Sequence, residues 1–293
     1  MKKIIVIGSI AVDNVTYTKN KMQPGMTVYG DSFLSNVGGK GANQACAIKF
    51  LGGDVEFYGA IGNDENGRYV HQFLEKLELD ARLKLSKLST GIANIIIDTN
   101  TAENSIIIVP GANKDLTNND IGNITFKGKD ILLTQLENDI DCTICAMKKA
   151  KENGLLVVLN PAPYHEIPKD AYQYIDFFIP NEHELEQFTP DINGPYLEKA
   201  QYLVQQGIKN VIVTLGDKGS MLVNKDENIT IDAIKVNAVD TTAAGDSYCG
   251  AFVTALSIDK SVVDAMKFAT CASAITVTRK GAISSLPKLS ELE

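Results

Sequence analysis

The chain has 293 residues, of which 44% are hydrophobic and 22% charged, a composition typical of a globular protein. Its formal net charge of −8 at pH 7 argues against a nucleic-acid-binding surface, which requires a basic patch, so small molecules are the expected ligands. With no signal-peptide pattern and no apolar run near 18 residues, we expect a cytoplasmic protein without a membrane partner.

Short apolar runs alternate with helical patterns along most of the chain. The runs predicted to be strands end at Gly8 or lie near 54–60, 130–136, 154–160, 176–181 and 210–216. The predicted helices run from Gly41 to Gly52 and over about 65–77, 139–153, 196–206, 246–256 and 261–278. This alternation predicts an α/β fold with a doubly wound, mostly parallel sheet and helices on both faces.

Two segments break this rhythm, because they contain short strand patterns without helices between them. Residues 14–36 hold the turn Pro24–Gly25, and residues 91–108 hold the polar turn "DTNTAEN", so both predict hairpins. We expect them to form a small antiparallel lid, with 1–13, 37–90 and 109–293 forming the α/β domain. The apolar residues of such a lid need a ligand or a second subunit to cover them.

Cysteine and histidine patterns give little sign of metal or redox chemistry. Cys142 and Cys145 form a C-x-x-C, but they lie within one apolar helical stripe and no second pair exists, which favours buried thiols. The three histidines are scattered and match no zinc spacing.

A glycine-rich stretch, "VGGKGANQAC", begins at Val37 and leads into a predicted helix. A phosphate-binding P-loop would need Ser or Thr after Lys40 and a glycine in place of Leu34, and the sequence has neither. The glycines still imply a close approach of the backbone to something before a helix N-terminus. Contact with a ligand and a purely structural turn both remain open on this pattern.

A second motif, "DTTAAGDSYCGAF", spans residues 240–252 and places small residues before a predicted helix. Free N–H groups at such a helix start form an anion-binding site. Asp246 at this point is either a helix N-cap or a base that takes a hydroxyl proton during phosphoryl transfer. The preceding Ala243–Gly245 favours the second interpretation, because a cap does not require them.

Together these motifs resemble the ribokinase branch of the PfkB carbohydrate kinases. The resemblance rests on "GSIAVD", "GGKGANQA", "GAN", "LLTQLE", "LNPAP", "PNEHELE", "TLGDKG", "DTTAAGDS" and "VTRKGA", which follow the family's order over essentially the whole chain. It implies an ATP-dependent sugar kinase with a doubly wound domain and a β lid. This agrees with the fold expected from the strand and helix patterns.

The resemblance also implies roles for individual residues. Asp246 would be the catalytic base, and Ala243, Ala244 and Gly245 would form the anion hole. Sugar contacts would come from Gly39, Lys40 and Asn43, with Asp13 and Glu137 accepting hydroxyl protons. The nucleotide site would include Asn181, Thr214, Leu215, Gly216, Asp217, Lys218, Gly219, Gly245 and Thr270.

Two cations are implied as well. Glu184 matches the acidic position linked to Mg²⁺ in the family, although a polar residue on a charged helix needs no ion. An activating K⁺ would bind mainly carbonyl oxygens of Asp240, Thr242, Thr276, Arg279, Gly281 and Ser285. The alternative for this second group is that the C-terminal loop merely packs against the 240–246 turn.

The chain departs from the family pattern at Ala11, where ribokinases carry an asparagine. Losing an amide should relax selectivity for the sugar hydroxyl that it bonds, and Asn14 should not compensate because it points to the opposite strand face. We therefore expect phosphorylation of D-ribose at O5, with 2-deoxyribose, another sugar or a nucleoside as alternatives. A catalytically inactive sugar-binding protein is the remote alternative, and dimerisation through the lid is a family expectation.

Overall fold

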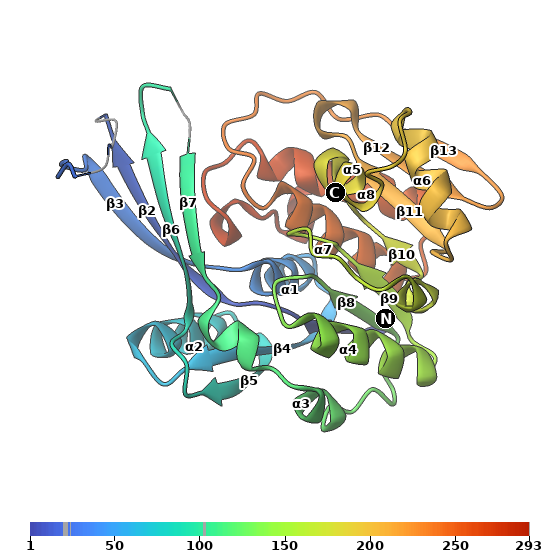
Figure 1. Cartoon of the computed structure of the whole chain (residues 1–293), viewed down its shortest axis with the longest axis horizontal. Helices are drawn as coiled ribbons and strands as arrows, with labels where there is room; N and C mark the ends of the chain where they lie inside the picture. Colours follow the sequence, from blue (N-terminus) through green and yellow to red (C-terminus); the bar gives the residue numbers. More distant parts are fainter. Residues whose placement is uncertain (20–22, 24, 102–103, 293) are drawn as a thin grey trace.

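The computed structural model describes residues 1–19, 23, 25–101 and 104–292. Within these residues, nine strands form one sheet in the order β13-β12-β11-β10-β9-β8-β1-β4-β5 (Figure 1). In chain order their bounds are β1 Lys3–Ile7, β4 Asp54–Gly62, β5 Asp80–Ser86, β8 Ile131–Thr134, β9 Leu156–Leu159, β10 Phe177–Phe178, β11 Asn210–Thr214, β12 Ser220–Asn224 and β13 Asn228–Ile231.

Helices cover both faces of this sheet. They are α1 Lys40–Phe50, α2 Glu65–Lys76, α3 Asn118–Gly122, α4 Ile140–Glu152, α5 Glu182–Phe188, α6 Tyr196–Gln205, α7 Ala244–Ser257 and α8 Val262–Thr276. Short 3₁₀ helices are η1 Gly111–Asp115, η2 Lys169–Tyr174, η3 Gly216–Lys218, η4 Ile283–Ser285 and η5 Leu289–Glu291.

Strand β1 shows why the sheet needs cover on both sides. Its residues are almost all apolar, and alternation sends Ile4 and Val6 into one core cluster and Ile5 and Ile7 into the other. The first cluster includes side chains of α1, α2, α7 and α8. The second includes those of α3, α4, α5 and α6. The predicted doubly wound α/β fold is therefore confirmed.

The two ends of the sheet were not predicted. Strand β5 pairs in parallel with β4 at one end. At the other end β12 pairs antiparallel with β11, and β13 pairs antiparallel with β12. The edge strands β5 and β13 consist mostly of exposed and half-buried residues, so their sequences carry a weaker strand pattern than those of central strands. All six predicted helices exist, with ends within a few residues of the expected bounds.

The second sheet has the order β3-β2-β6-β7, with β2 Ala11–Thr18, β3 Ser32–Gly38, β6 Gly91–Asp98 and β7 Asn104–Val109. Figure 1 shows these strands rising together at one end of the molecule, away from α4–α8. We call this sheet the lid sheet. The predicted turns at Pro24–Gly25 and over 98–104 include residues 24 and 102–103, which lie outside the described residues.

The lid sheet is mixed, so the prediction of a wholly antiparallel lid was wrong. Each hairpin is antiparallel, but β2 and β6 pair in parallel, with Asp13 beside Ala93. Both strands leave the α/β domain at the same root and are the first strands of their hairpins. Joining the hairpins through these two strands therefore makes the central pair parallel.

The root of the lid sheet is tightly fastened. Only Gly8, Ser9 and Ile10 separate β1 from β2. The side chain of Asn113, in η1, accepts a hydrogen bond from the Ile10 N–H at 2.9 Å and donates one to the Ile10 carbonyl at 2.7 Å. The start of the first hairpin is thus bonded to the segment that follows the second hairpin.

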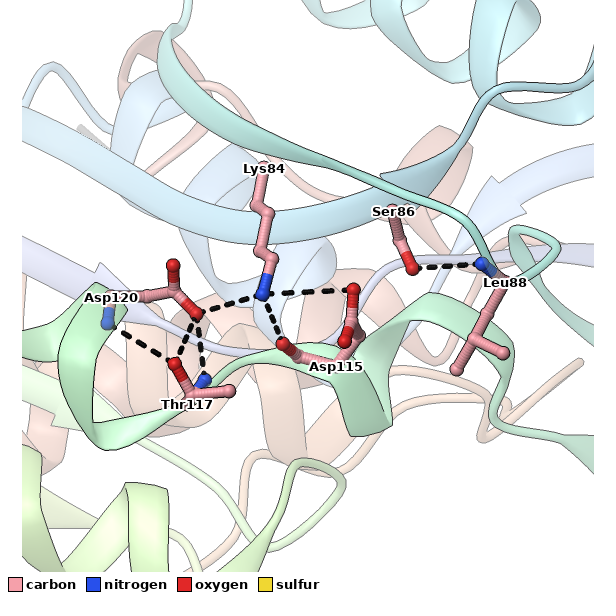
Figure 2. Close-up of polar contacts among 6 residues, drawn as sticks. All are labelled: Lys84, Ser86, Leu88, Asp115, Thr117 and Asp120. Atoms are coloured by element: carbon pink, nitrogen blue, oxygen red, sulfur yellow. Dashed lines mark hydrogen bonds and ion pairs between the residues drawn. The ribbon is translucent and has the colours of Figure 1, made fainter.

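A polar cluster ties the edge strand β5 to the chain leaving the lid (Figure 2). The Lys84 ammonium donates to the Asp120 carboxylate at 2.8 Å and to the Asp115 carbonyl at 2.5 Å. Asp120 also accepts the Thr117 N–H and hydroxyl as part of the capping box of α3. One lysine therefore holds η1 and the start of α3 against the sheet.

The remaining expectations concern cysteines and membranes. All five cysteines are free thiols; Cys142 is buried in α4, which raises its pKa to about 12, whereas Cys145 is half-buried. Among the described residues, none of the helices has the length and hydropathy needed to span a bilayer.

Candidate active site

The glycine-rich stretch joins β3 to α1, and its glycines are packed against the β1–β2 connection. A Cβ at Gly41 would lie 2.4 Å from the carbonyl carbon of Gly8, and one at Gly39 would lie 2.9 Å from the Ile10 Cα. Gly39 also has φ of 89°, which favours glycine. A Cβ at Gly38 would collide with the Asp13 carboxylate. The close backbone approach inferred from these glycines is therefore an approach to another segment of the same chain, residues 8–13.

Helix α1 begins at Lys40, where a carboxylate receives the free backbone N–H. The Lys40 N–H donates to Glu137 Oε2 at 3.0 Å, and the same oxygen accepts the Ser9 hydroxyl. A negative charge at a helix N-terminus is favourable. Glu137, which follows β8, is thus placed beside α1 as the expected sugar site requires.

Helix α7 begins at Ala244, and its N-cap is Ala243, a non-glycine residue in the left-handed region with φ of 59°. Asp246 lies two positions into the helix, and α7 has no side-chain cap, so the N-cap interpretation of Asp246 was wrong. The Ala244 N–H donates to the Thr241 carbonyl at 3.2 Å. The N–H groups of Gly245 and Asp246 belong to the first turn, where the helix supplies no acceptor.

The Asp246 carboxylate is 6% exposed and bonded to two amides of α1. Asn43 Nδ2 donates to Oδ2 at 2.9 Å, and Gln44 Nε2 donates to Oδ1 at 2.9 Å. Each carboxylate oxygen keeps acceptor capacity after taking one hydrogen bond. Asp246 is therefore held by α1, and its carboxylate can still accept a hydrogen bond from a further donor.

A pocket of about 170 Å³ lies in front of the first turn of α7. A Cβ at Gly245 would meet no atom within 4 Å, so this turn faces open space. The pocket brings together eight predicted residues, Lys40, Asn181, Glu184, Thr214, Ala243, Ala244, Gly245 and Asp246. It adds five residues that were not predicted, Asn160, Ala162, Ile179, Thr241 and Cys249.

Lysine 40 is the cation of this site. Burial by itself would lower the pKa of its ammonium group, but the charges of Asp246, Glu137 and Glu184 raise the pKa above its ordinary value. Lys40 therefore stays protonated at neutral pH. A half-buried permanent cation beside a helix N-terminus suits an anionic ligand group.

Asp13 approaches the same group of charges from the lid sheet. Burial, with the charges of Glu137 and Asp246, raises its pKa to about 6. Ala11 precedes it on the same face of β2 and is buried. Asn14 points to the other face, where its amide bonds Asn94 and Ser35, so Asn14 does not substitute for an amide at position 11.

The predicted nucleotide residues are divided between the pocket and its surroundings. Asn181 caps α5, and Glu184 completes the capping box by accepting the Asn181 N–H at 2.9 Å. Burial raises the pKa of Glu184. Residues 214–219 run from the end of β11 through η3, where Gly216 and Gly219 have positive φ. Thr270 lies buried in α8, bonded to the Met266 carbonyl and outside the pocket lining.

The predicted K⁺ residues lie where the 240–246 turn meets the C-terminal loop. The Asp240 carboxylate accepts the N–H of Thr242 and of Gly281, each at 2.9 Å, which lowers its pKa despite the burial that opposes this. Thr276 is bonded to Ser247, in α7. The two segments therefore pack together, which a K⁺ site and its alternative both require. Ser285 is buried in η4, and Arg279 forms an ion pair with Glu291.

Several polar residues of the site were missed, although they stood in the motifs that carried the resemblance. Gln44 belongs to "GGKGANQA", Gln135 to "LLTQLE" and Asn160 to "LNPAP". All three are buried, and Gln44 is hydrogen-bonded to Gln135, to Asn160 and to Asp246. These residues could have been predicted, because each is an amide in a motif that was already assigned to the same site.

The chain was compared with known proteins. A family model described as pfkB family carbohydrate kinase matches residues 1–289. Ribokinase of Haemophilus influenzae is 37% identical over 298 residues, which cover 99% of this chain and 97% of that protein. Deoxyribokinase of Salmonella typhi is 36% identical over 296 residues, which cover 98% and 96%.

Solved structures agree with this. Ribokinase from Thermotoga maritima has a TM-score of 0.92 and 38% identity, covering 100% of this chain and 98% of that one. Ribokinase from Arabidopsis thaliana, complexed with ribose and ATP, has a TM-score of 0.90 and 29% identity, covering 99% and 97%. The chain belongs to the pfkB family of carbohydrate kinases and is a phosphotransferase of the ribokinase type.

Proposed function

We propose that this carbohydrate kinase transfers the γ-phosphoryl group of ATP to O5 of D-ribose, with Asp246 as the general base. The observation that carries the proposal is the position of Asp246 in the first turn of α7, where its carboxylate faces a pocket beside Lys40. The relatives include ribokinases over their full length. The similar Arabidopsis enzyme binds both ribose and ATP.

Asp246 accepts the proton of the attacking hydroxyl in this proposal. The N–H groups at the start of α7, from the N-cap Ala243 to Gly245, receive the negative charge that develops on the transferred group, and the Ala244 N–H gives up its bond to the Thr241 carbonyl to do so. The Lys40 ammonium lies in the same pocket and adds a fixed positive charge. Phosphoryl transfer depends mainly on such positioning and charge stabilisation.

The sugar lies between α1 and the lid sheet in this proposal. Asp13 and Glu137 accept its hydroxyl protons, while Gly39, Lys40 and Asn43 contact it. Asn43 Oδ1 is buried without a hydrogen-bond partner among the described residues, and a sugar hydroxyl would supply one. A set of carboxylates, an amide and an ammonium group suits an uncharged polyol.

The nucleotide and its cations use the other half of the site. Asn181, residues 214–219 and Thr270 would line the ATP site. Glu184 is a buried carboxylate in the pocket and would be a ligand of the Mg²⁺ that neutralises phosphate charge. Oxygen atoms of Asp240, Thr242, Thr276, Arg279, Gly281 and Ser285 would hold a K⁺ that orders the 240–246 turn.

A second substrate, 2-deoxyribose, is favoured by Ala11. Its methyl group lies on the Asp13 face of β2 and offers no hydrogen bond to a hydroxyl. A site without the bonding amide discriminates weakly between a sugar and its deoxy analogue. Deoxyribokinase of Salmonella is also about as similar to this chain as the ribokinases are.

The experiment measures kcat/KM for ribose and for 2-deoxyribose in wild type and in Ala11→Asn. We expect wild type to discriminate less than about tenfold, and the variant to favour ribose by at least about tenfold more. Asn14→Ala, on the opposite face of the same strand, is the matched control and should leave the ratio unchanged. A strong ribose preference in wild type would remove the second substrate. Absence of turnover across pentoses, hexoses and nucleosides, with and without K⁺, would remove the kinase proposal.

Dimerisation through the lid sheet is also proposed. Strand β7, at its edge, exposes Ile106, Ile107 and Ile108, and β3 exposes Phe33 and Leu34. Such a run of apolar residues on an edge strand needs cover. Light scattering should give a dimer mass for wild type and for Ile258→Lys, whose site lies on the α/β domain, and a monomer mass for Ile107→Lys. A monomeric wild type would contradict the proposal.

A further inference from the structure

The orientation of the Asp246 carboxylate depends on an amide that touches no predicted ligand. Gln44 is completely buried at the interface of α1 and α7. Its Nε2 donates to Asp246 Oδ1 at 2.9 Å and to Asn160 Oδ1 at 3.1 Å, and its Oε1 accepts from Gln135 Nε2 at 2.6 Å. Every polar atom of this side chain is thus engaged.

This arrangement permits one orientation of the Gln44 amide. Rotating it by 180° would place Oε1 against the oxygens of Asp246 and Asn160, which both accept hydrogen bonds, and Nε2 against the Gln135 donor. Asn160 is itself fixed, because its Nδ2 donates to the Ile179 carbonyl at 2.9 Å. The network therefore ensures that Gln44 presents its Nε2 donor, and not its oxygen, to the Asp246 carboxylate.

The backbone holds the network at close range. Gly250 lies one turn after Asp246, and a Cβ at this position would be 2.6 Å from the Ala47 Cβ and 3.0 Å from the Gln44 carbonyl oxygen. Helices α1 and α7 therefore approach each other more closely than a residue larger than glycine at position 250 would allow. The separation of Gln44 from Asp246 is fixed by this contact between helices.

We propose that Gln44 is a positioning residue for phosphoryl transfer, and that Gln135 fixes the amide of Gln44 in the donating orientation. The inference rests on the proposed role of Asp246 as base. Gln44 keeps one carboxylate oxygen bonded, so that the incoming hydroxyl meets the carboxylate in one orientation. Misplacing a reacting group by about 1 Å lowers the rate by up to about a hundredfold.

The pH dependence of the rate reports on this hydrogen bond. A hydrogen bond to a carboxylate favours its ionised form, so losing the donor moves the acid limb of the pH–rate profile to higher pH. The other charged or titratable groups that face Asp246 come from five segments: Asp13 of β2, Lys40 of α1, Glu137 after β8, Glu184 of α5 and Cys249 of α7. None of these is changed by substitution of Gln44.

The test compares kcat, KM and the pH–rate profile of wild type, Gln44→Met, Gln44→Glu, Asp246→Asn and Thr254→Val. Met keeps the length of Gln44 without the donor. Glu puts a second carboxyl group against Asp246. Thr254→Val is the matched control, because it removes a buried hydrogen bond elsewhere in α7, from the Thr254 hydroxyl to the Gly250 carbonyl.

We expect Gln44→Met to lower kcat by about tenfold to a hundredfold, with KM for sugar and ATP within about twofold, since no ligand contact is lost. Its acid limb should move to higher pH, and that of Gln44→Glu should move further. If Gln44→Met loses only thermal stability, as Thr254→Val should, the proposal is wrong. If Asp246→Asn keeps the wild-type kcat, the assignment of the base fails instead.

Gln135→Met keeps the proposal testable if Gln44→Met does not fold. This variant removes one of the groups that hold the Gln44 amide in its donating orientation, without touching Asp246. Its acid limb should move in the same direction by a smaller amount. An unchanged acid limb in folded Gln135→Met would overturn the proposal.

Discussion

Two carboxylates of the site, Asp246 and Asp13, sit in contrasting surroundings. Asp246 lies between α1 and α7, 6% exposed, with an amide on each oxygen. Asp13 lies on a lid strand, half-buried, where burial and two neighbouring carboxylates raise its pKa to about 6. Asp246 is held by hydrogen bonds within a packed core. The ionised form of Asp13, by contrast, is disfavoured by its surroundings.

If the proposed roles hold, Asp246 acts in phosphoryl transfer and Asp13 acts in the choice of sugar. The proposed base for phosphoryl transfer, Asp246, is built into the helix–sheet core, which close packing makes rigid. The proposed sugar ligand Asp13 belongs to a sheet with an exposed apolar edge. Changes in the core should therefore affect rate and stability, whereas changes in the lid sheet should affect selectivity and pH dependence.

Removal of the proposed base should have the largest effect. Asp246→Asn keeps the size of the side chain but cannot accept the proton, so kcat should fall by at least about a thousandfold. The measurement is steady-state turnover with ribose or 2-deoxyribose. Circular dichroism should show an unchanged fold, and a variant with more than a tenth of wild-type turnover would contradict the role of Asp246.

Two glycines of α7 should respond in opposite ways to the same substitution. Gly250→Ala places its Cβ 2.6 Å from Ala47, and this overpacking should lower the free energy of unfolding by about 2 kcal/mol. A Cβ at Gly245 meets no atom within 4 Å, so Gly245→Ala should preserve stability while its methyl group obstructs the pocket and lowers kcat/KM. Urea unfolding and turnover separate the two, and equal losses of stability would refute the distinction.

Asp13 should make stability depend on pH. A folded-state pKa of about 6 is above the value in the unfolded chain, so ionisation of Asp13 opposes folding. Its contribution is present below about pH 4 and is lost as pH rises through 6. Asp13→Asn should therefore be more stable than wild type by about 1–2 kcal/mol at pH 8, with no advantage at pH 4.

Urea unfolding between pH 4 and pH 8 measures this difference. The matched control is Asp31→Asn, which changes an exposed aspartate of the lid segment. Its stability should run parallel to that of wild type across this range. A constant difference between Asp13→Asn and wild type would show that the charge at position 13 carries no such cost.

The Lys84 cluster should give the smallest effect. Lys84→Met removes hydrogen bonds to Asp115 and Asp120 at a partly exposed site, so the free energy of unfolding should fall by about 1 kcal/mol. The effect should shrink in high salt. Arg82→Met, which breaks an exposed pair with Asp80 on the same strand, is the control and should change stability less.

The sequence predicts the layered fold well, because buried parallel strands and their helices have strong patterns. It predicts the mixed lid sheet less well, because strand direction in the β2–β6 pair depends on where both hairpins join the domain. The edge strands β5 and β13 were missed for lack of an apolar run. Strand β12, which lies between β13 and β11, was missed although Met221–Val223 is apolar. Tertiary position, rather than local propensity, decides these elements.

The candidate site shows the same division. Asp246 and Lys40 could be found from motifs, and the structure places both in one pocket. The role of the glycines in Gly38–Gly41 could not be found from motifs. The atoms that these glycines approach belong to residues 8–13, and this contact exists only after folding. The Gln44 network likewise depends on four segments that are far apart in the sequence, around Gln44, Gln135, Asn160 and Asp246.

The two hydrogen bonds between Asn113 and Ile10 have a mechanical consequence. They join the entry of the first lid hairpin to the exit of the second, so neither hairpin can tilt alone at this point. Any rotation of the lid sheet must bend the strands beyond Ile10, and force applied to one hairpin is transmitted to the other. The Ile10 amide should consequently exchange its hydrogen with solvent as slowly as the centre of β1.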